Sequence, residues 1–105
     1  MEDKVIKYLL ENCKGYNKRK KSIEIMKYLN INDNKSLRRI IEKIRQDNKN
    51  KIFICSEAGH KGGYWIAKDY REIDQTIEHL EKRAYEMLKT AKILRKKVKK
   101  RKFWW

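Results

Sequence analysis

A chain of 105 residues is long enough for one domain with an appendage, and its 29 basic and 14 acidic side chains give it a formal charge of +15. Hydrophobic residues make up 40%, which is enough for a small core, so we expect a folded rather than a disordered chain. No apolar run exceeds the four residues of Ile52–Cys55 or Tyr64–Ala67, which excludes a membrane-spanning helix. The N-terminus lacks an apolar signal core and two cysteines cannot form a disulfide framework, so we expect a cytoplasmic protein.

The positive charge is concentrated at the C-terminal end. Residues 1–69 carry 17 basic and 9 acidic side chains, and residues 70–86 carry three basic and five acidic ones. Residues 87–105 carry nine basic side chains and no acidic one. So one-sided an excess favours a polyanion as partner, and a tail that only aids solubility is the alternative.

Two helices are predicted in the first 29 residues. Over Glu2–Cys13, apolar residues share one face of a helix, namely Val5, Ile6, Leu9, Leu10 and Cys13. Ser22 is a suitable N-cap for a short second helix of about Ile23–Leu29. Its inward positions are predicted to be Ile23, Met26 and Leu29.

A third helix of about Asn34–Asp47 follows the turn Asn30–Asp33, and Asp33 can cap it. Its apolar side is formed by Leu37, Ile40, Ile41 and Ile44. A short helix, a tight turn and a longer helix form the arrangement called helix-turn-helix.

A β-hairpin is predicted directly after this helix-turn-helix. Two short strands, Ile52–Cys55 and Gly63–Ala67, flank a loop that contains two glycines. In this position a hairpin is a wing. Trp65 alternates with Tyr64 and Ile66, so we expect its side chain to face outward or onto the following helix. For this side chain, packing in the core or in an interface is favoured over stacking on nucleic-acid bases.

A long helix is predicted from a capping box at Asp69 and Glu72 to about Lys100. Apolar and small residues repeat along it at alternating steps of four and three, namely Ile73, Ile77, Leu80, Ala84, Met87, Ala91, Leu94 and Val98. A lone helix cannot bury this seam, so we expect it to dimerise as a coiled coil. The alternative, which is compatible with dimerisation, is that the first turns near Ile73 and Ile77 pack on the chain's own first helix.

The third helix carries the best candidates for reading DNA. A guanidinium matches guanine bidentately, which favours Arg38 and Arg39, and the N-terminal end of such a helix usually contacts DNA. Residues at that end are Asn34, Lys35 and Ser36. An ordinary solvated helix face is the alternative interpretation.

Phosphate contacts are predicted from a basic loop and from the wing tip. The loop precedes the second helix and contains Lys18, Arg19, Lys20 and Lys21. Lys61 lies at the wing tip, where a wing crosses the minor groove or the DNA backbone. Contacts of this kind add affinity without sequence information.

Three stretches of the chain resemble the winged helix-turn-helix domains of small bacterial and phage regulators. They are Ser22–Leu29, Ser36–Arg45 and Gly62–Ala67, and the resemblance extends over about residues 2–80. It implies a mainly α fold with a two-stranded wing and binding of double-stranded DNA by a phage or mobile-element transcriptional regulator in a bacterial or infected host cell. The turn Asn30–Asp33 departs from the family's usual glycine-containing turn.

Enzymatic motifs are missing from the sequence. It has no phosphate-binding Gly-x-x-x-x-Gly-Lys loop, no Gly-x-Ser-x-Gly elbow and no His-Glu-x-x-His pair. The cysteines and histidines lack the Cys-x-x-Cys spacing of a structural zinc site. We therefore expect neither catalysis nor a cofactor or metal.

The expected organisation is a winged helix-turn-helix domain at 1–69, a long helix at 70–100 and a basic-aromatic tail at 101–105. Two other functions remain open, namely replication initiation at an origin and inhibition of a host defence protein. For the tail residues Phe103, Trp104 and Trp105, a protein partner, base stacking and contact with a membrane surface are all open.

Overall fold

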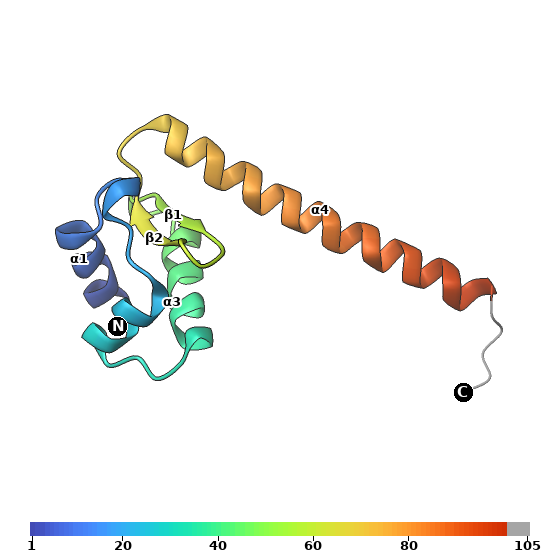
Figure 1. The fold of residues 1–105 in the computed structure, drawn as a ribbon, viewed down its shortest axis with the longest axis horizontal. Coiled ribbons are helices and arrows are strands. Elements are labelled where there is room, and N and C mark those ends of the chain that lie inside the picture. The colour runs from blue at the N-terminus through green and yellow to red at the C-terminus, as the bar shows by residue number, and fades with distance from the viewer. Residues whose placement is uncertain (101–105) are drawn as a thin grey trace.

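The computed structural model describes residues 1–100, without the side chain of Lys100, and its order of elements confirms the predicted fold class (Figure 1). The predicted tail at 101–105 lies outside the described residues. The elements are α1 (Glu2–Asn12), the short 3-10 helix η1 (Tyr16–Lys18), α2 (Ser22–Leu29), α3 (Asn34–Gln46), β1 (Ile54–Glu57), β2 (Gly63–Ile66) and α4 (Tyr70–Lys100).

The core lies where α1 and α3 meet the hairpin. Its fully buried side chains include Val5, Leu9, Ile25, Leu37, Ile41 and Ile44. Two predicted inward positions are wrong, because Ile23 is 56% exposed and Leu10 is 48% exposed. For α2 the error lies in the start of the helix, since Lys21 rather than Ser22 is the N-cap, and Ile25 takes the buried position.

The turn between α2 and α3 is built from asparagine and aspartate. Asn30 adopts the left-handed conformation at φ 56°, which ends α2, and the buried side chain of Ile31 anchors the turn to the core. The predicted cap of α3 is confirmed, because Asp33 Oδ1 accepts a hydrogen bond from the Ser36 amide at 2.7 Å. This hydrogen bond lowers the pKa of the Asp33 carboxyl.

The first strand lies two residues later than predicted. Antiparallel pairing joins Ile54 to Ile66 and Glu57 to Gly63, whereas Phe53 is 57% exposed outside the ladder. The loop segment before α2 extends the hairpin, because Lys20 and Tyr64 exchange two backbone hydrogen bonds of 2.9 and 3.0 Å. Glycine is required at 63, since a Cβ there would collide with the Lys20 carbonyl.

The start of α4 is fixed to the hairpin by one buried carboxylate. The Asp69 side chain accepts from the Glu72 amide at 3.1 Å, which confirms the N-terminal cap. Glu72 Oε1 accepts from Trp65 Nε1 at 3.0 Å and from the Lys68 amide at 3.2 Å, and Oε2 accepts from the Tyr16 amide at 3.1 Å. Trp65 is therefore buried against the first turn of α4, the second of the two orientations predicted for it.

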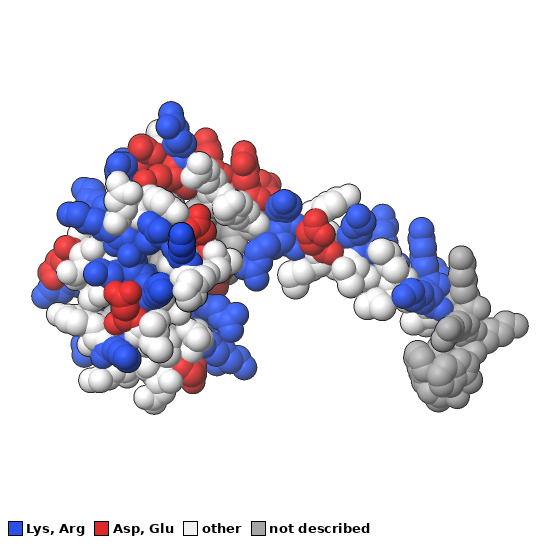
Figure 2. All heavy atoms as spheres, viewed as in Figure 1, with Lys and Arg blue, Asp and Glu red and all other residues white. Residues whose placement is uncertain are grey.

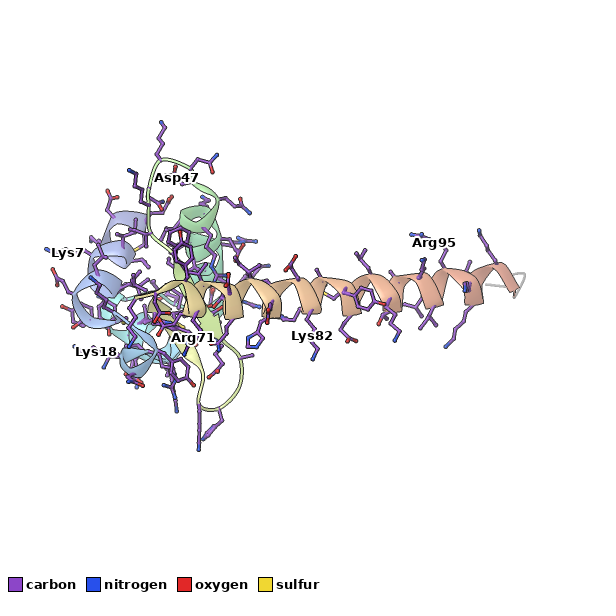
Figure 3. All side chains as sticks on the ribbon, turned by 90° about the horizontal axis from the view of Figure 1, so that it is seen from above. Lys7, Lys18, Asp47, Arg71, Lys82 and Arg95 are labelled. Atoms are coloured by element: carbon purple, nitrogen blue, oxygen red, sulfur yellow. The ribbon has the colours of Figure 1, made fainter. Side chains whose placement is uncertain are left out.

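Beyond its first turns, α4 leaves the body of the protein as an arm (Figures 1 and 3). Its first turns pack mainly against β1, whereas the alternative interpretation of the sequence places them on the first helix. The buried side chains Glu72 and Thr76 face the body, and from Ile77 to Lys99 every residue is exposed. The arm gives the molecule extents of 56 × 32 × 31 Å.

Candidate functional site

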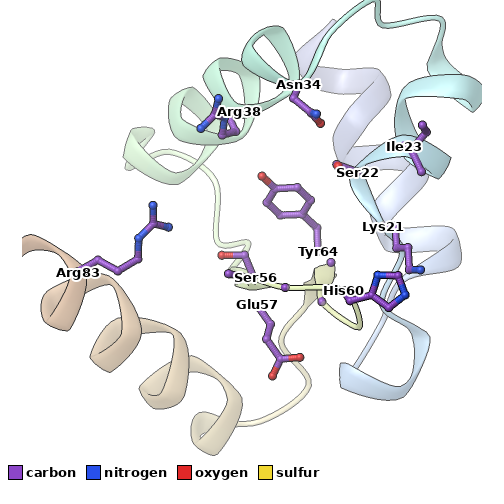
Figure 4. Close-up of a pocket in the computed structure, with 14 residues that line it drawn as sticks. Lys21, Ser22, Ile23, Asn34, Arg38, Ser56, Glu57, His60, Tyr64 and Arg83 are labelled. Carbon is purple, nitrogen blue, oxygen red and sulfur yellow. The ribbon is translucent and has the colours of Figure 1, made fainter.

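A groove of about 610 Å³ lies between α3, the start of α2 and the hairpin (Figure 4). Asn34 and Arg38 line it from α3, Lys21 lines it from the N-cap of α2, and His60 lines it from the hairpin loop. A neighbouring hollow of about 350 Å³ joins Lys21 to Arg19 and Lys61. The two hollows therefore bring five of the ten predicted DNA-binding residues onto one face.

The other candidates on α3 point elsewhere. Lys35 and Arg39 are exposed but do not line the groove, although Arg39 is adjacent to Arg38 in the chain. Ser36 is half-buried, and its amide is held by Asp33. Successive residues of a helix diverge by about 100°, which is why two neighbouring arginines cannot both face the groove.

The basic loop divides into residues with different surroundings. Arg19 donates to the carbonyl oxygens of Lys61 at 2.7 Å and Tyr16 at 3.1 Å, and its guanidinium lies 4.1 Å from the centre of the Tyr16 ring. It thereby ties the loop to the hairpin tip. Lys20 Nζ lies 3.9 Å from the Glu24 carboxylate, whereas Lys18 and Lys21 are exposed.

Tyr64 forms part of the groove and was not among the predicted site residues. Its ring rises from β2 with the hydroxyl directed toward α3 (Figure 4). Burial raises the pKa of the Tyr64 phenol, and Arg45 and Arg38 oppose this rise. The phenol is therefore a neutral donor and acceptor at physiological pH. The alternation of residues in β2 indicates a core position for Tyr64. For that reason the sequence does not predict its hydroxyl as part of a binding site.

Arg83 lines the same groove from α4 (Figure 4). No local sequence motif predicts Arg83 as a site residue, because its position depends on the angle at which α4 leaves the hairpin. Two guanidinium groups from distant parts of the sequence thus face one concave surface.

Arg45 fixes the angle between α3 and the hairpin. It donates to the Ile54 carbonyl oxygen through Nε at 3.1 Å and Nη2 at 2.9 Å, and Nη2 also donates to Ser56 Oγ at 3.0 Å. Nη1 lies 3.1 Å from the Glu42 carboxylate. Arg45 therefore holds one wall of the groove against the other.

The charges on α4 are divided along its length. Figure 2 shows acidic side chains over its first turns and mainly basic ones along its far part. The acidic residues are Glu72, Asp74, Glu78, Glu81 and Glu86, whereas residues 87–100 contain seven basic residues and no acidic one.

Among residues 1–100, no three metal-ligating side chains of His, Cys, Asp or Glu come together, and no helix combines the length and apolar composition needed to cross a membrane. No protein-family model, curated protein or solved structure matches the chain significantly.

Proposed function

We propose that this protein binds double-stranded DNA without catalysing a reaction, and that α3 and the hairpin form the contact surface. The observation that carries the proposal is the groove that Lys21, Arg38 and Arg83 line from the N-cap of α2, from α3 and from α4, with Glu57 as the one acidic residue in its lining. A concave surface lined by more cations than anions suits a phosphate backbone.

In this proposal the N-terminal half of α3 enters the major groove. Arg38 and Asn34 are then the side chains that reach base edges, since arginine pairs with guanine and asparagine with adenine. Lys21 and Lys61 contact phosphates on either side, and Arg19 positions the hairpin tip as a wing. Arg83 adds a phosphate contact from α4.

The protein acts as a dimer in this proposal, with the seam of α4 as the interface. Met87 is 70% exposed, Leu94 55% and Val98 50%, so the apolar stripe is open to a partner. Burying a large apolar side chain contributes about 1.5–3 kcal/mol before association costs. A dimeric winged helix-turn-helix protein in the cytoplasm suits a transcriptional regulator of phage or mobile-element type.

Selection of bound sequences from a pool of random duplexes tests this function. We expect an enriched, near-palindromic motif, because a symmetric dimer reads two copies of one half-site. Arg38→Ala should lose the preference at one base position of the motif. Lys7→Ala, which removes an exposed lysine of α1 that does not line the groove, should leave the motif unchanged. Binding without enrichment would instead favour a non-specific DNA binder, and absence of binding would favour inhibition of a protein partner.

A further inference from the structure

The middle of the exposed stripe of α4, from Leu80 to Leu94, alternates between large and small residues. Leu80, Met87 and Leu94 recur every seven residues, and Ala84 and Ala91 lie between them. In a two-helix coiled coil each residue of this stripe faces a residue of the other helix. The orientation of the partner therefore decides which sizes meet.

A parallel pairing would distribute volume unevenly. Each residue would face its own copy, so layers of two alanines would alternate with layers of two methionines or two leucines. In an antiparallel pairing, Leu80 can face the partner's Ala91 while Ala84 faces the partner's Met87. Each of the four central layers then holds one large and one small side chain, which fills the middle of the interface evenly, and Ile77 faces the partner's Leu94 on either side of it.

Charge favours the same orientation. Residues 70–86 have a net charge of −2, and residues 87–100 carry seven positive charges. A parallel pair would place two basic halves side by side, whereas an antiparallel pair places each acidic half beside a basic half. In the register given above, Asp74 flanks the seam beside the partner's Arg95.

We propose that α4 pairs antiparallel with α4 of a second copy, with Leu80 packed on the partner's Ala91 and Ala84 on the partner's Met87. This inference rests on the proposed dimer and adds its orientation and register. The two DNA-binding bodies then lie at opposite ends of the paired helices, and the basic half of each α4 runs toward the other body.

Spin labels at two sites distinguish the orientations. Cys13 and Cys55 are buried in the core, so a thiol-specific label is directed to a new cysteine at Tyr85→Cys or Lys96→Cys. In the antiparallel register, position 85 lies level with position 86 of the partner along the helix axis, so two labels at 85 are separated only across the helix pair. Labels at 96 lie in addition about 30 Å apart along the axis at 1.5 Å per residue. We expect a short distance for the label at 85 and a longer one, by about 20 Å or more, for the label at 96. Equal distances at both sites would overturn the antiparallel orientation and leave the dimer intact.

Charge reversal provides a second test. Asp74→Lys should weaken dimerisation about fivefold, and adding Arg95→Glu should restore it, because the two residues are neighbours only in the antiparallel register. Failure of the double variant to recover would refute this register. Sedimentation of the wild type gives the independent control, since a monomer at high micromolar concentration would refute the dimer itself, whatever the duplex-binding result.

Discussion

The carboxylate of Glu72 joins the start of α4 to the preceding strand and loop and to Tyr16, which is 56 positions away in the sequence. It accepts hydrogen bonds from the Tyr16 amide, the Trp65 indole and the Lys68 amide, and the residue is only 8% exposed. Hydrogen bonds to a buried charged group are stronger than neutral ones, and each donor left without its acceptor is penalised. Glu72 therefore sets where α4 leaves the hairpin and hence where Arg83 lies.

Replacing Glu72 by glutamine should destabilise the fold. The amide keeps one acceptor oxygen but presents an N–H group to a donor, so at least one of the three hydrogen bonds is lost. We expect the free energy of unfolding to fall by about 1–3 kcal/mol in urea titrations. Glu78→Gln, an exposed change on the same helix, is the control and should have little effect. Equal losses in the two variants would contradict the role of Glu72.

The buried thiol of Cys13 should make stability depend on alkaline pH. Burial raises the pKa of Cys13 from 9.0 to about 11. Below pH 9 the thiol is protonated in both folded and unfolded chains, so it adds no pH dependence. Between about pH 9 and 11 the unfolded chain ionises first, and stability falls as pH rises.

We expect the wild type to lose about 1–2 kcal/mol more than Cys13→Ala between pH 8 and pH 10.5. Urea unfolding of both chains at the two pH values measures this difference. Parallel losses in the two chains would show that another group accounts for the alkaline dependence.

Arg38 and Lys21 should differ in what they contribute to DNA binding. Arg38→Ala should weaken binding to the selected duplex by about 1–3 kcal/mol and relax one base position, because in the proposed complex the residue faces the base edges. Lys21→Ala should weaken selected and random duplexes alike and lower the salt slope by about one unit. The same pattern of loss in both variants, measured by anisotropy on both duplexes, would contradict this division.

At the scale of elements, the sequence predicts the order of helices and strands because local signals mark their ends. Asp33 and Asp69 cap α3 and α4 as expected. The errors arise where tertiary contacts override local signals. β1 begins two residues later than predicted because its register is set by pairing with β2 and by Arg45. The first turn of α4 is held at the hairpin because the Glu72 carboxylate accepts from Trp65 of β2 and the Glu72 carbonyl oxygen accepts from Cys55 Sγ of β1.

The far half of α4 is the place to test dimerisation without disturbing the body. Leu80 borders a hollow beside β1, so a charge there affects both the body and the seam. Leu94→Glu should instead yield a monomer with an unchanged urea midpoint for the body. Lys96→Glu also introduces a glutamate, but on the face of the helix opposite the seam. This variant should remain a dimer in sedimentation. A dimeric Leu94→Glu protein would exclude the seam as the interface.

For the whole molecule, the sequence predicts part of the candidate site. Lys21, Lys61 and Arg38 could be chosen from their places in a helix-turn-helix with a wing. Arg83 could not, because the direction of α4 depends on contacts between residues more than 50 positions apart, such as Tyr16 and Glu72. The sequence predicts Arg19 only as a phosphate contact, whereas in the structure its guanidinium also donates to the Lys61 carbonyl oxygen and so holds the hairpin tip.

The salt dependence of duplex binding tests the central claim most directly. Three cations on the proposed DNA surface are assigned to phosphates, namely Lys21, Lys61 and Arg83. If each neutralises a phosphate, the logarithm of the association constant should fall against the logarithm of salt with a slope of about −3 for each bound copy. Arg83→Ala should reduce this slope by about one unit. An affinity for duplex DNA that does not change with salt, or no binding at low salt, would contradict the proposed function.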